Sequence, residues 1–458
     1  MIPESDIIHL FWVIGSIFTL MLVAELWRLL GHPEPEHTRK LVHLGSGFIS
    51  MSFGFLFQSH WSVAILCVLF ITTLALTRKL GWLKSVHGVS RSSHGAVLFP
   101  IATYLTFLFA SATGQFLFYF ISIGVLSTSD TLAAFVGNRY GQRKYAVEAS
   151  YFKSWEGSLF FFISTFLIIH LSLLLGSDTG RLACVLIALW VAIFVTVFEA
   201  FSLEGTDNIW IPLGTFYLLW KIGAKDLDTI VLDMAFLVGS IALSYLTLWP
   251  KRKLEPLVIL GLGLLLDASF RLLTWNWGIP VWTAFALFNF SGVIRLRYLD
   301  HRIQVRAVVY AVGATLLWIL VSNLFPSRYA DVMTVPYLLT ISSMLSIAWG
   351  LVQDKVSGLS PWHYRQMGKS AVRSGVMLIL IFAPQMYFYP ALRSPLPVLL
   401  FLAGTIVADR VYNFLVRVHG ARLLPLFRMR FAFFVTVLVA SAALGVCALQ
   451  DSEIWSAL

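Results

Sequence analysis

Charged residues are scarce in this chain of 458 residues. Asp, Glu, Lys and Arg make up only 12% of it, whereas 58% is hydrophobic. Soluble domains carry about twice that share of charge. The shortage excludes an ordinary soluble globular protein and indicates an integral membrane protein, whose backbone polar groups must find their hydrogen-bond partners inside helices.

Cysteine is nearly absent as well. Cys67, Cys184 and Cys447 lie far apart, each inside an apolar run. That spacing excludes a disulfide framework and a metal site built from thiolates, and it is typical of small core residues. The first residues, MIPESDIIHLFW, also lack the basic start of a cleavable signal peptide, so we expect the first apolar run to be retained as a helix.

Long apolar runs, by contrast, recur along the whole chain. Examples cover residues 7–30, 61–76, 157–175, 184–198, 257–273 and 431–447. A membrane-spanning helix needs ~20 mostly apolar residues, and roughly sixteen segments meet that requirement. The sequence therefore predicts an all-α polytopic integral membrane protein with about 16 transmembrane helices.

The basic residues are unevenly shared between the loops. Of the 33 Lys and Arg, about 25 fall in loops after odd-numbered helices and about 5 after even-numbered ones. This alternation predicts that the basic loops are cytoplasmic and both termini outside, and it explains the net charge of +10 without a nucleic-acid partner. Because no signal or transit segment is visible, a bacterial inner (plasma) membrane is the expected location.

The clearest internal boundary is WPKRKLEP, residues 249–256, which combines basic residues with two prolines. It predicts a first domain over residues 1–250 with about nine helices and a second over residues 251–458 with about seven. Nearly all the polar residues that suggest chemistry lie in the first domain. Those of the second, such as Asp409 and Arg410, are expected at or near cytoplasmic loops and are interpreted as charges that set the topology, with one or two ion pairs.

Residues 130–157, DTLAAFVGNRYGQRKYAVEASYFKSWEG, hold an unusual set of polar groups for so apolar a chain. Asp130 lies near the cytoplasmic end of the fifth helix, where an acid is costly and indicates function. Gly137 and Gly141 share its helical face, which lets a backbone or a ligand approach closely. Lys153 and Glu156 are expected on one face at the start of the next helix, whose free N–H groups can bind phosphate.

These groups together suit a nucleoside triphosphate with magnesium. Such a ligand needs a carboxylate for the cation and cationic donors for the phosphates. Simpler interpretations stay open for each group by itself. The glycines also fit helix packing, Asp130 also fits an ion pair with an arginine, and the basic residues also fit a topology signal.

Two basic patches lie on the same membrane side in this topology. In HTRKLVHLGSGF, residues 37–48, Arg39 and His43 are four residues apart and share a helical face, with Lys40 beside them. In SRSSHGAVLFP, Arg91 leads into the fourth helix. As alternatives, the basic residues are charge anchors for their helices and His43 is a buried, hydrogen-bonded histidine.

An acidic patch occupies FEAFSLEGTDNIWIPL, residues 198–213. It contains Glu199, Glu204, Asp207 and Asn208 but no Lys or Arg. Orientation rules do not call for acids there, whereas cation binding does. Pro212 is expected to end or kink a helix at this point, and broken helices at membrane depth often mark binding sites.

Four motifs, RKLVHLGSGF, the D-x-x-A-A-x-x-G-x-x-x-G run, KSWEGS and DNIWIPL, occur in this order. The ordered set resembles the CTP-dependent lipid-alcohol kinases, which include phytol kinase and dolichol kinase, and the resemblance covers about residues 36–250. It implies transfer of the γ-phosphate of a nucleoside triphosphate, usually CTP, to the hydroxyl of a membrane isoprenoid alcohol or diacylglycerol. It also implies a divalent cation such as Mg²⁺ and an active site at the cytoplasmic face.

The resemblance also implies roles for the matching residues. The expected catalytic residues are Asp130, Lys153 and His43. The expected metal ligands are Asp130, Glu156 and Asp207. The expected phosphate and nucleotide contacts are Arg39, Lys40, Gly137, Gly141, Lys153 and Gly157. Further residues of the site are Glu199, Glu204, Asn208 and Arg91. The base that takes the hydroxyl proton stays open between His43, Asp130 and Glu199.

One departure and several alternatives accompany this resemblance. Thr206 stands where members of the family often have a second acid, which leaves the set of cation ligands open. CDP-diacylglycerol synthase shares the core motif but ends in a signature that this chain lacks, so a cytidylyltransferase is the alternative enzyme. A membrane transporter or a scaffold is the alternative outside catalysis. Polar residues at one membrane face and the lack of internal repeats favour the kinase.

Overall fold

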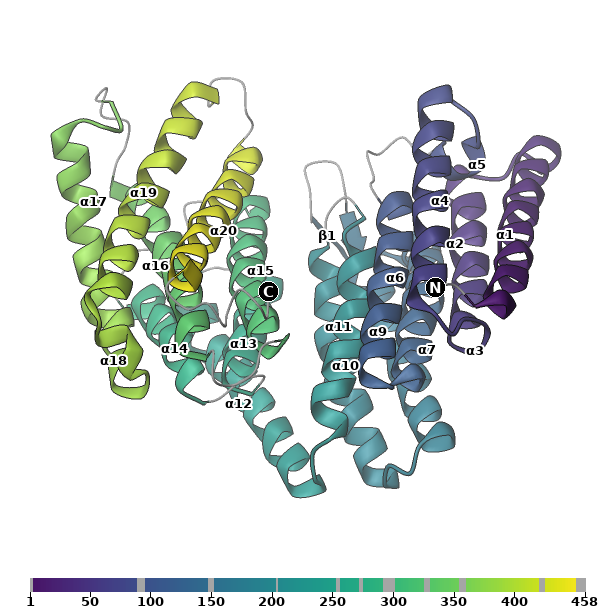
Figure 1. Ribbon diagram of the computed structural model, residues 1–458, viewed down its shortest axis with the longest axis horizontal. Helices are drawn as coiled ribbons and strands as arrows, with labels where there is room; N and C mark the ends of the chain where they lie inside the picture. The colour runs from purple at the N-terminus through teal and green to yellow at the C-terminus, as the bar shows by residue number, and fades with distance from the viewer. Residues whose placement is uncertain are drawn as a thin grey trace. The chain divides into compact units, whose positions relative to one another are not determined.

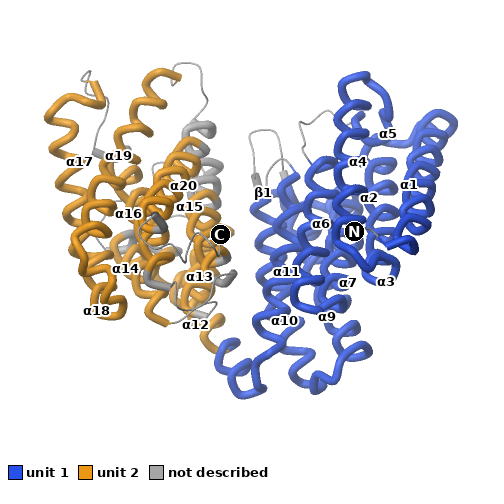
Figure 2. Tube along the Cα trace, in the orientation of Figure 1, with its two compact units in different colours: residues 1–234 blue, residues 235–458 orange. Residues whose placement is uncertain are grey.

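The structure is a computed structural model that describes residues 3–88, 95–146, 152–202, 205–252, 256–271, 275–290, 301–324, 330–353, 360–419 and 425–449. It divides into two compact units, residues 1–234 and 235–458 (Figures 1 and 2). The sequence-based boundary after residue 250 falls inside α12 (Leu227–Arg252), a helix that contributes to both units.

The first unit is a helical bundle with one small hairpin at one end (Figure 1). Its helices are α1 (Glu4–Gly31), α2 (Pro35–Met51), α3 (Phe53–Leu56), α4 (His60–Leu80), α5 (Lys84–His87), α6 (Gly95–Thr113), α7 (Phe116–Gly124), α8 (Asp130–Tyr140), α9 (Trp155–Gly176), α10 (Arg181–Phe201), α11 (Asp207–Gly223) and the first part of α12. A π-helical turn, η1 (Val125–Ser129), joins α7 to α8, and the hairpin consists of β1 (Lys144–Ala146) and β2 (Phe152–Ser154).

The second unit is helical throughout its described residues. It contains α13 (Pro256–Arg271), α14 (Trp275–Phe290), α15 (His301–Leu324), α16 (Ala330–Gln353), α17 (Tyr364–Met377), the π-helical η4 (Leu378–Phe382), α18 (Gln385–Phe388), the 3-10 turn η5 (Pro390–Arg393), α19 (Pro395–His419) and α20 (Pro425–Leu449). The helical class predicted from the long apolar runs is thus confirmed for both units.

Nine helices among the described residues are long and apolar enough to cross a membrane, so the predicted count of about sixteen is not confirmed. Two helices of the first unit, α2 and α11, have only 17 residues each and begin with polar residues. They are shorter than the ~20 residues that a span needs. The same two helices carry the motifs RKLVHLGSGF and DNIWIPL, which explains why they are less apolar than their neighbours.

The core of the first unit lies between α1, α2, α4, α6 and α7. Ile17, Phe70, Phe107 and Tyr119 are buried there. Asp6 anchors the end of this core: its carboxylate accepts the N–H groups of residues 58 and 59 and, at 2.6 Å, the hydroxyl of Ser62. These bonds satisfy donors at the start of α4, so this buried acid has a structural role.

Buried charges of the second unit meet between α16, α17 and α19. Asp409 is fully buried and pairs with Arg373 at 2.5 Å and with its neighbour Arg410. The hydroxyl of Ser370 donates to the same carboxylate. The predicted ion pairing is confirmed, but Asp409 and Arg410 lie inside α19 and not in a loop.

Candidate active site

The π-helical turn η1 places Asp130 at the start of α8. A π turn interrupts the regular backbone ladder, and such bulges are frequent at functional sites. The Leu126 carbonyl oxygen of this turn lies 3.3 Å from Nε2 of His43, and the same nitrogen lies 3.3 Å from Oδ2 of Asp130. Because both neighbours are acceptors, Nε2 is the protonated nitrogen and Nδ1 keeps the lone pair.

Asp130 is also the partner of Lys40. The ammonium of Lys40 lies 2.5 Å from Oδ2 of Asp130 and 3.2 Å from its carbonyl oxygen, and the two side chains are 4% and 14% exposed. Arg39 points elsewhere: it binds the carboxylate of Glu36 at 2.5 Å. α2 thus places the Lys40 ammonium and the His43 imidazole beside one carboxylate, that of Asp130. Lys40 and Asp130 are 90 residues apart in the sequence.

A second buried ion pair joins Lys153 to Glu199. The Lys153 ammonium lies 2.6 Å from Oε1 of Glu199 and 2.9 Å from the hydroxyl of Ser202, and it also contacts the Glu199 carbonyl. The other oxygen of Glu199 accepts the hydroxyl of Ser158 at 3.4 Å, and Ser158 shares a hydrogen bond of 2.7 Å with Tyr145. In this structure Glu199 is therefore the counter-charge of Lys153.

Lys153 reaches this position from a strand. It lies in β2 opposite Tyr145 of β1, and α9 begins only at Trp155. The expectation that Lys153 and Glu156 share a helical face is therefore wrong, because Ser154 is the extended N-cap residue of α9 and accepts the N–H of Gly157 at 3.1 Å.

Glu156 takes part in the turn between the hairpin and α9. Its Oε1 accepts the backbone N–H of Arg143 at 3.1 Å. Its second oxygen is buried and has no hydrogen-bond partner among the described residues. The carboxylate thus has one oxygen committed to local structure and one still available for a ligand.

The glycines of the second and third motifs bring α8 and α9 together. A side chain on Gly157 would meet the Ala133 carbonyl oxygen at 2.9 Å and the Cα of Gly137 at 3.3 Å, and one on Gly141 would meet Ser154 at 2.7 Å. Such spacing needs residues without a side chain. Helix packing therefore accounts for all three glycines.

Asp207 and Asn208 of the acidic patch are the first two residues of α11. Oδ1 of Asp207 accepts the N–H of Asn208 at 3.0 Å, and the amide of Asn208 donates to the Gly95 carbonyl of α6 at 2.8 Å. Burial opposes the charge on Arg39, but the Glu36 carboxylate and then the charges of Asp130 and Asp207 raise the pKa of its guanidinium. The same two aspartates interact electrostatically with Glu199, so the acids of separate motifs are neighbours.

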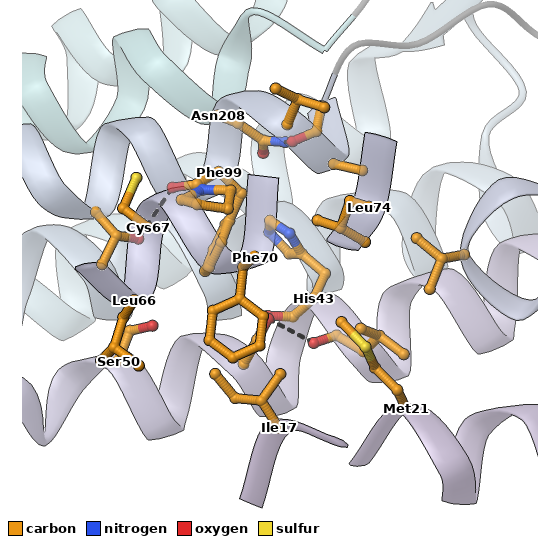
Figure 3. A pocket seen from close by; sticks show the side chains of 18 of the residues that line it. Ile17, Met21, His43, Ser50, Leu66, Cys67, Phe70, Leu74, Phe99 and Asn208 are labelled. Atoms are coloured by element: carbon orange, nitrogen blue, oxygen red, sulfur yellow. Dashed lines mark hydrogen bonds between the residues drawn. The ribbon is translucent and has the colours of Figure 1, made fainter. Parts of the chain in front are cut away.

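A cavity of about 170 Å³ opens beside this charge cluster, between α1, α2, α4, α5 and α6. Its walls are mostly apolar. Figure 3 shows the imidazole of His43 in the pocket near Phe70 and Leu74, with Asn208 on the side opposite Ile17. Arg39, His43 and Ser50 line it from one face of α2, which confirms the predicted common face of Arg39 and His43.

Comparison with known proteins finds relatives of the N-terminal part of this chain. A family model described as the cytidylyltransferase family matches residues 7–205. Phytol kinase from Synechocystis is 34% identical over 203 residues, which cover 44% of this chain and 85% of that protein. The chain belongs to the phytol kinase family. The membership concerns its N-terminal part.

Plant members of the phytol kinase family match the same part less completely. A probable chloroplastic phytol kinase 1 from rice is 32% identical and covers 41% of this chain and 65% of its own length. A probable chloroplastic phytol kinase from maize is 30% identical and covers 42% and 69%, respectively. No solved structure matches this chain.

The structure brings the predicted charged residues together in two sets. One set consists of Lys40, His43 and Asp130, and the other of Lys153 and Glu199. Asp130 and Asp207 interact electrostatically with both Arg39 and Glu199, which links the sets. Among the residues described, no three His, Cys, Asp or Glu side chains are close enough to hold a metal ion as they stand. Arg91 and Glu204 lie outside the described residues.

Two basic residues of the cavity were not predicted as site residues. Arg78, at the end of α4, and His87, in α5, both line it. In the sequence they are one arginine and one histidine of a basic loop, with no feature that separates them from residues that set the topology. Their position is revealed only by the packing of α5 against α1 and α2 and by the contact between His87 and Thr77 of α4.

Proposed function

We propose that this chain is a lipid-alcohol kinase that transfers the γ-phosphate of a nucleoside triphosphate, CTP being the expected one, to a long-chain isoprenoid alcohol of the phytol class. The observation that carries the proposal is a largely apolar cavity lined by His43, whose Nε2 lies 3.3 Å from the buried Asp130. An apolar tail fits the walls, and a hydroxyl fits the polar end. The family membership supports the same reaction.

His43 is the proton acceptor in this proposal. Lys40 stabilises the anionic form of Asp130, which makes that carboxylate a poor base. Asp130 in turn accepts the Nε2 proton of His43, so Nδ1 is left with the lone pair. The substrate hydroxyl loses its proton to Nδ1, its oxygen bonds to the γ-phosphorus, and the nucleoside diphosphate leaves with the bridging oxygen.

The lysines bind the phosphates through an exchange of partners. In the structure Lys40 and Lys153 are paired with Asp130 and Glu199. With a triphosphate in the site, the two lysines would bind its phosphate oxygens, and a divalent cation would balance the remaining carboxylates, so that no buried charge would be left unpaired. Asp130 and Asp207, with the second oxygen of Glu156, would hold this Mg²⁺ ion, which would neutralise charge on the phosphates.

The membrane orientation belongs to the same proposal. The hairpin, which carries Lys153, and α5, which is bonded to the start of α2, lie at the same end of the first unit (Figure 1). The positive-inside pattern favours the cytoplasm for that end, with both chain termini on the other side. The alcohol then enters from the cytoplasmic leaflet of a membrane that we propose to be a bacterial inner membrane.

One observation favours a second candidate. The matching family model is described as a cytidylyltransferase family, and the same charge cluster suits transfer of a cytidylyl group to a phosphate. The two reactions differ in the bond that breaks. The kinase moves the γ-phosphorus, whereas the cytidylyltransferase moves the α-phosphorus and releases diphosphate.

A transfer assay separates these reactions. The purified full chain is given CTP labelled at the α- or the γ-position, Mg²⁺, and phytol, geranylgeraniol, undecaprenol, diacylglycerol or phosphatidate. The proposal expects γ-label on an isoprenoid alcohol and α-label on no lipid. α-Label on phosphatidate assigns the cytidylyltransferase reaction instead, and label on no lipid rejects both.

Filling the cavity should discriminate between long and short alcohols. Ser50 lines the cavity and lies about 16 Å along α2 from Arg39. We expect Ser50→Trp to lower kcat/KM for a C20 alcohol by about tenfold or more, because the indole takes the place of the tail, and to spare a five-carbon prenol.

Phe48→Trp is the matched control, because Phe48 is on the same helix but 55% exposed. It should leave both alcohols unaffected. If Ser50→Trp slows the short and the long alcohol equally, the cavity does not hold the tail.

A further inference from the structure

Basic side chains gather at one end of the cavity. The residues Arg39, Arg78 and His87, which line it, come from the start of α2, the end of α4 and α5. Arg39 is paired with Glu36, and no Asp or Glu is among the described residues that line the cavity. Arg78 is exposed, whereas the apolar walls around Ile17 and Leu66 are buried. The cavity therefore runs from a basic mouth to a closed apolar interior.

The mouth is built from fixed elements. Nε2 of His87 lies 3.1 Å from the hydroxyl of Thr77 in α4. The backbone of Ser85 in α5 is held at both ends: its N–H donates to Glu25 of α1 at 3.0 Å, and its carbonyl accepts the hydroxyl of Thr38 of α2 at 3.0 Å. These bonds hold α5, and with it His87, against α1, α2 and α4.

Arg78 and His87 line the same part of the cavity, because Nε2 of His87 lies 3.1 Å from the hydroxyl of Thr77, the residue next to Arg78. Burial, and then the charge of Arg78, lower the pKa of His87. A neutral imidazole beside a guanidinium offers one hydrogen-bond donor and one delocalised cation. This pair suits a doubly charged oxyanion better than a hydroxyl.

A phosphate monoester is the ligand group with these properties. It carries about −1.5 to −2 charge at pH 7 and three strong acceptor oxygens. An arginine binds such a group through two parallel hydrogen bonds. The apolar interior beyond the mouth requires that the ester carry a long hydrocarbon tail.

We propose that Arg78 and His87, together with Arg39, form a headgroup site for the phosphate monoester of a long-chain alcohol, with the tail in the apolar cavity. This inference rests on the proposed function in one respect: the monoester is then the product of the transfer, and the mouth retains it after the nucleoside diphosphate leaves. An anionic two-chain lipid such as phosphatidate has the same head chemistry and is the other source to be tested.

Equilibrium binding tests the site without any turnover. The purified full chain in detergent, with no nucleotide, is titrated with geranylgeranyl monophosphate, geranylgeraniol and phosphatidate, and tryptophan fluorescence follows binding. We expect the monophosphate to bind about tenfold or more tightly than the alcohol, as one charge-assisted contact allows. Arg78→Gln should abolish most of this preference, and Arg78→Lys should restore part of it.

Lys79→Gln is the matched control, because Lys79 is the exposed neighbour of Arg78 and does not line the cavity. It removes the same charge and should keep the preference. His87→Gln gives a second, independent variant that should weaken it if Arg78→Gln does not fold. Equal affinity of wild type for alcohol and monophosphate overturns the proposal, as does an Arg78→Gln protein that behaves like Lys79→Gln.

The result also separates this inference from the kinase. If the protein binds the single-chain monophosphate preferentially but transfers no label to an alcohol, the headgroup site exists and the proposed function fails. Preference for phosphatidate, with α-label on that lipid, makes the mouth a substrate site of a cytidylyltransferase and overturns its assignment to the monoester product. Label on the alcohol without any binding preference supports the kinase and rejects the headgroup site.

Discussion

Asp130→Asn should lower kcat by at least about a hundredfold, the size of effect expected when an acid–base pair is disrupted. Asp130 is the shared partner of Lys40 and His43, at 2.5 and 3.3 Å. Its amide variant carries no charge, so it neither offsets the charge of a protonated imidazole nor binds a divalent cation as strongly as a carboxylate does. The measurement is γ-phosphate transfer per folded molecule.

Folding must be controlled, because the substitution also leaves Lys40 buried without its counter-charge. Removing one partner of a buried pair costs about 3–5 kcal/mol. A double variant, Lys40→Met with Asp130→Leu, removes both charges and should regain thermal stability but not turnover. Asp6→Asn alters a fully buried but structural carboxylate of the same unit and should reduce stability without changing kcat. A near-normal kcat for Asp130→Asn would remove Asp130 from the mechanism.

Lys153→Met is expected to have the second-largest effect, a loss of about a hundredfold or more in kcat/KM for the nucleotide. Lys153 and Glu199 are 7% and 8% exposed, and the Lys153 ammonium is the cation proposed to bind the phosphates. Without it the developing charge on the transferred phosphoryl group loses a fixed donor. The measurement is the transfer rate as a function of CTP concentration.

Two comparisons separate catalysis from structure at this pair. Lys153→Met with Glu199→Gln removes both charges, so thermal stability should recover while turnover stays low. Lys225→Met breaks the pair with Asp233, at 2.5 Å in the same unit, and should leave the transfer rate unchanged. Recovery of activity in the double variant would assign the Lys153–Glu199 pair to folding alone.

The cavity and the two ion pairs suit the two substrates of the proposed reaction. A lipid-alcohol kinase must bring a membrane-soluble tail and a water-soluble triphosphate to one phosphorus atom. In the first unit, α2 lines the cavity with Arg39 and His43 and supplies Lys40 to the charge cluster. Because neighbouring residues of one helix face different surroundings, this single helix connects the apolar and the ionic part of the site.

The second unit has its own buried charges but no assigned chemistry. Asp409 with Arg373 and Arg410 lies between helices of that unit, and the family model ends at residue 205. Buried ion pairs in membrane helices are costly. The variants described above act on the first unit only, so the transfer assay on them does not depend on a role for residues 235–458.

By itself, the sequence determined the helical membrane class and the residue types of the site. Run length, charge distribution and motif order are local properties, so the apolar spans and the motifs around Asp130 and Lys153 can be recognised without a structure. The N-cap of α9 is a local feature of the same kind, since the side chain of Ser154 accepts a hydrogen bond from Gly157, three residues further along the chain.

The tertiary structure alone decided which charges meet. Lys40 and Asp130 are 90 residues apart, and Lys153 and Glu199 are 46 apart; no local pattern encodes such pairs. It also decided that Lys153 lies in a strand, that the three glycines pack two helices, and that Arg78 and His87 line a cavity. The physical reason is common to all: these contacts depend on how distant helices pack, and packing is fixed by the shape of the whole unit.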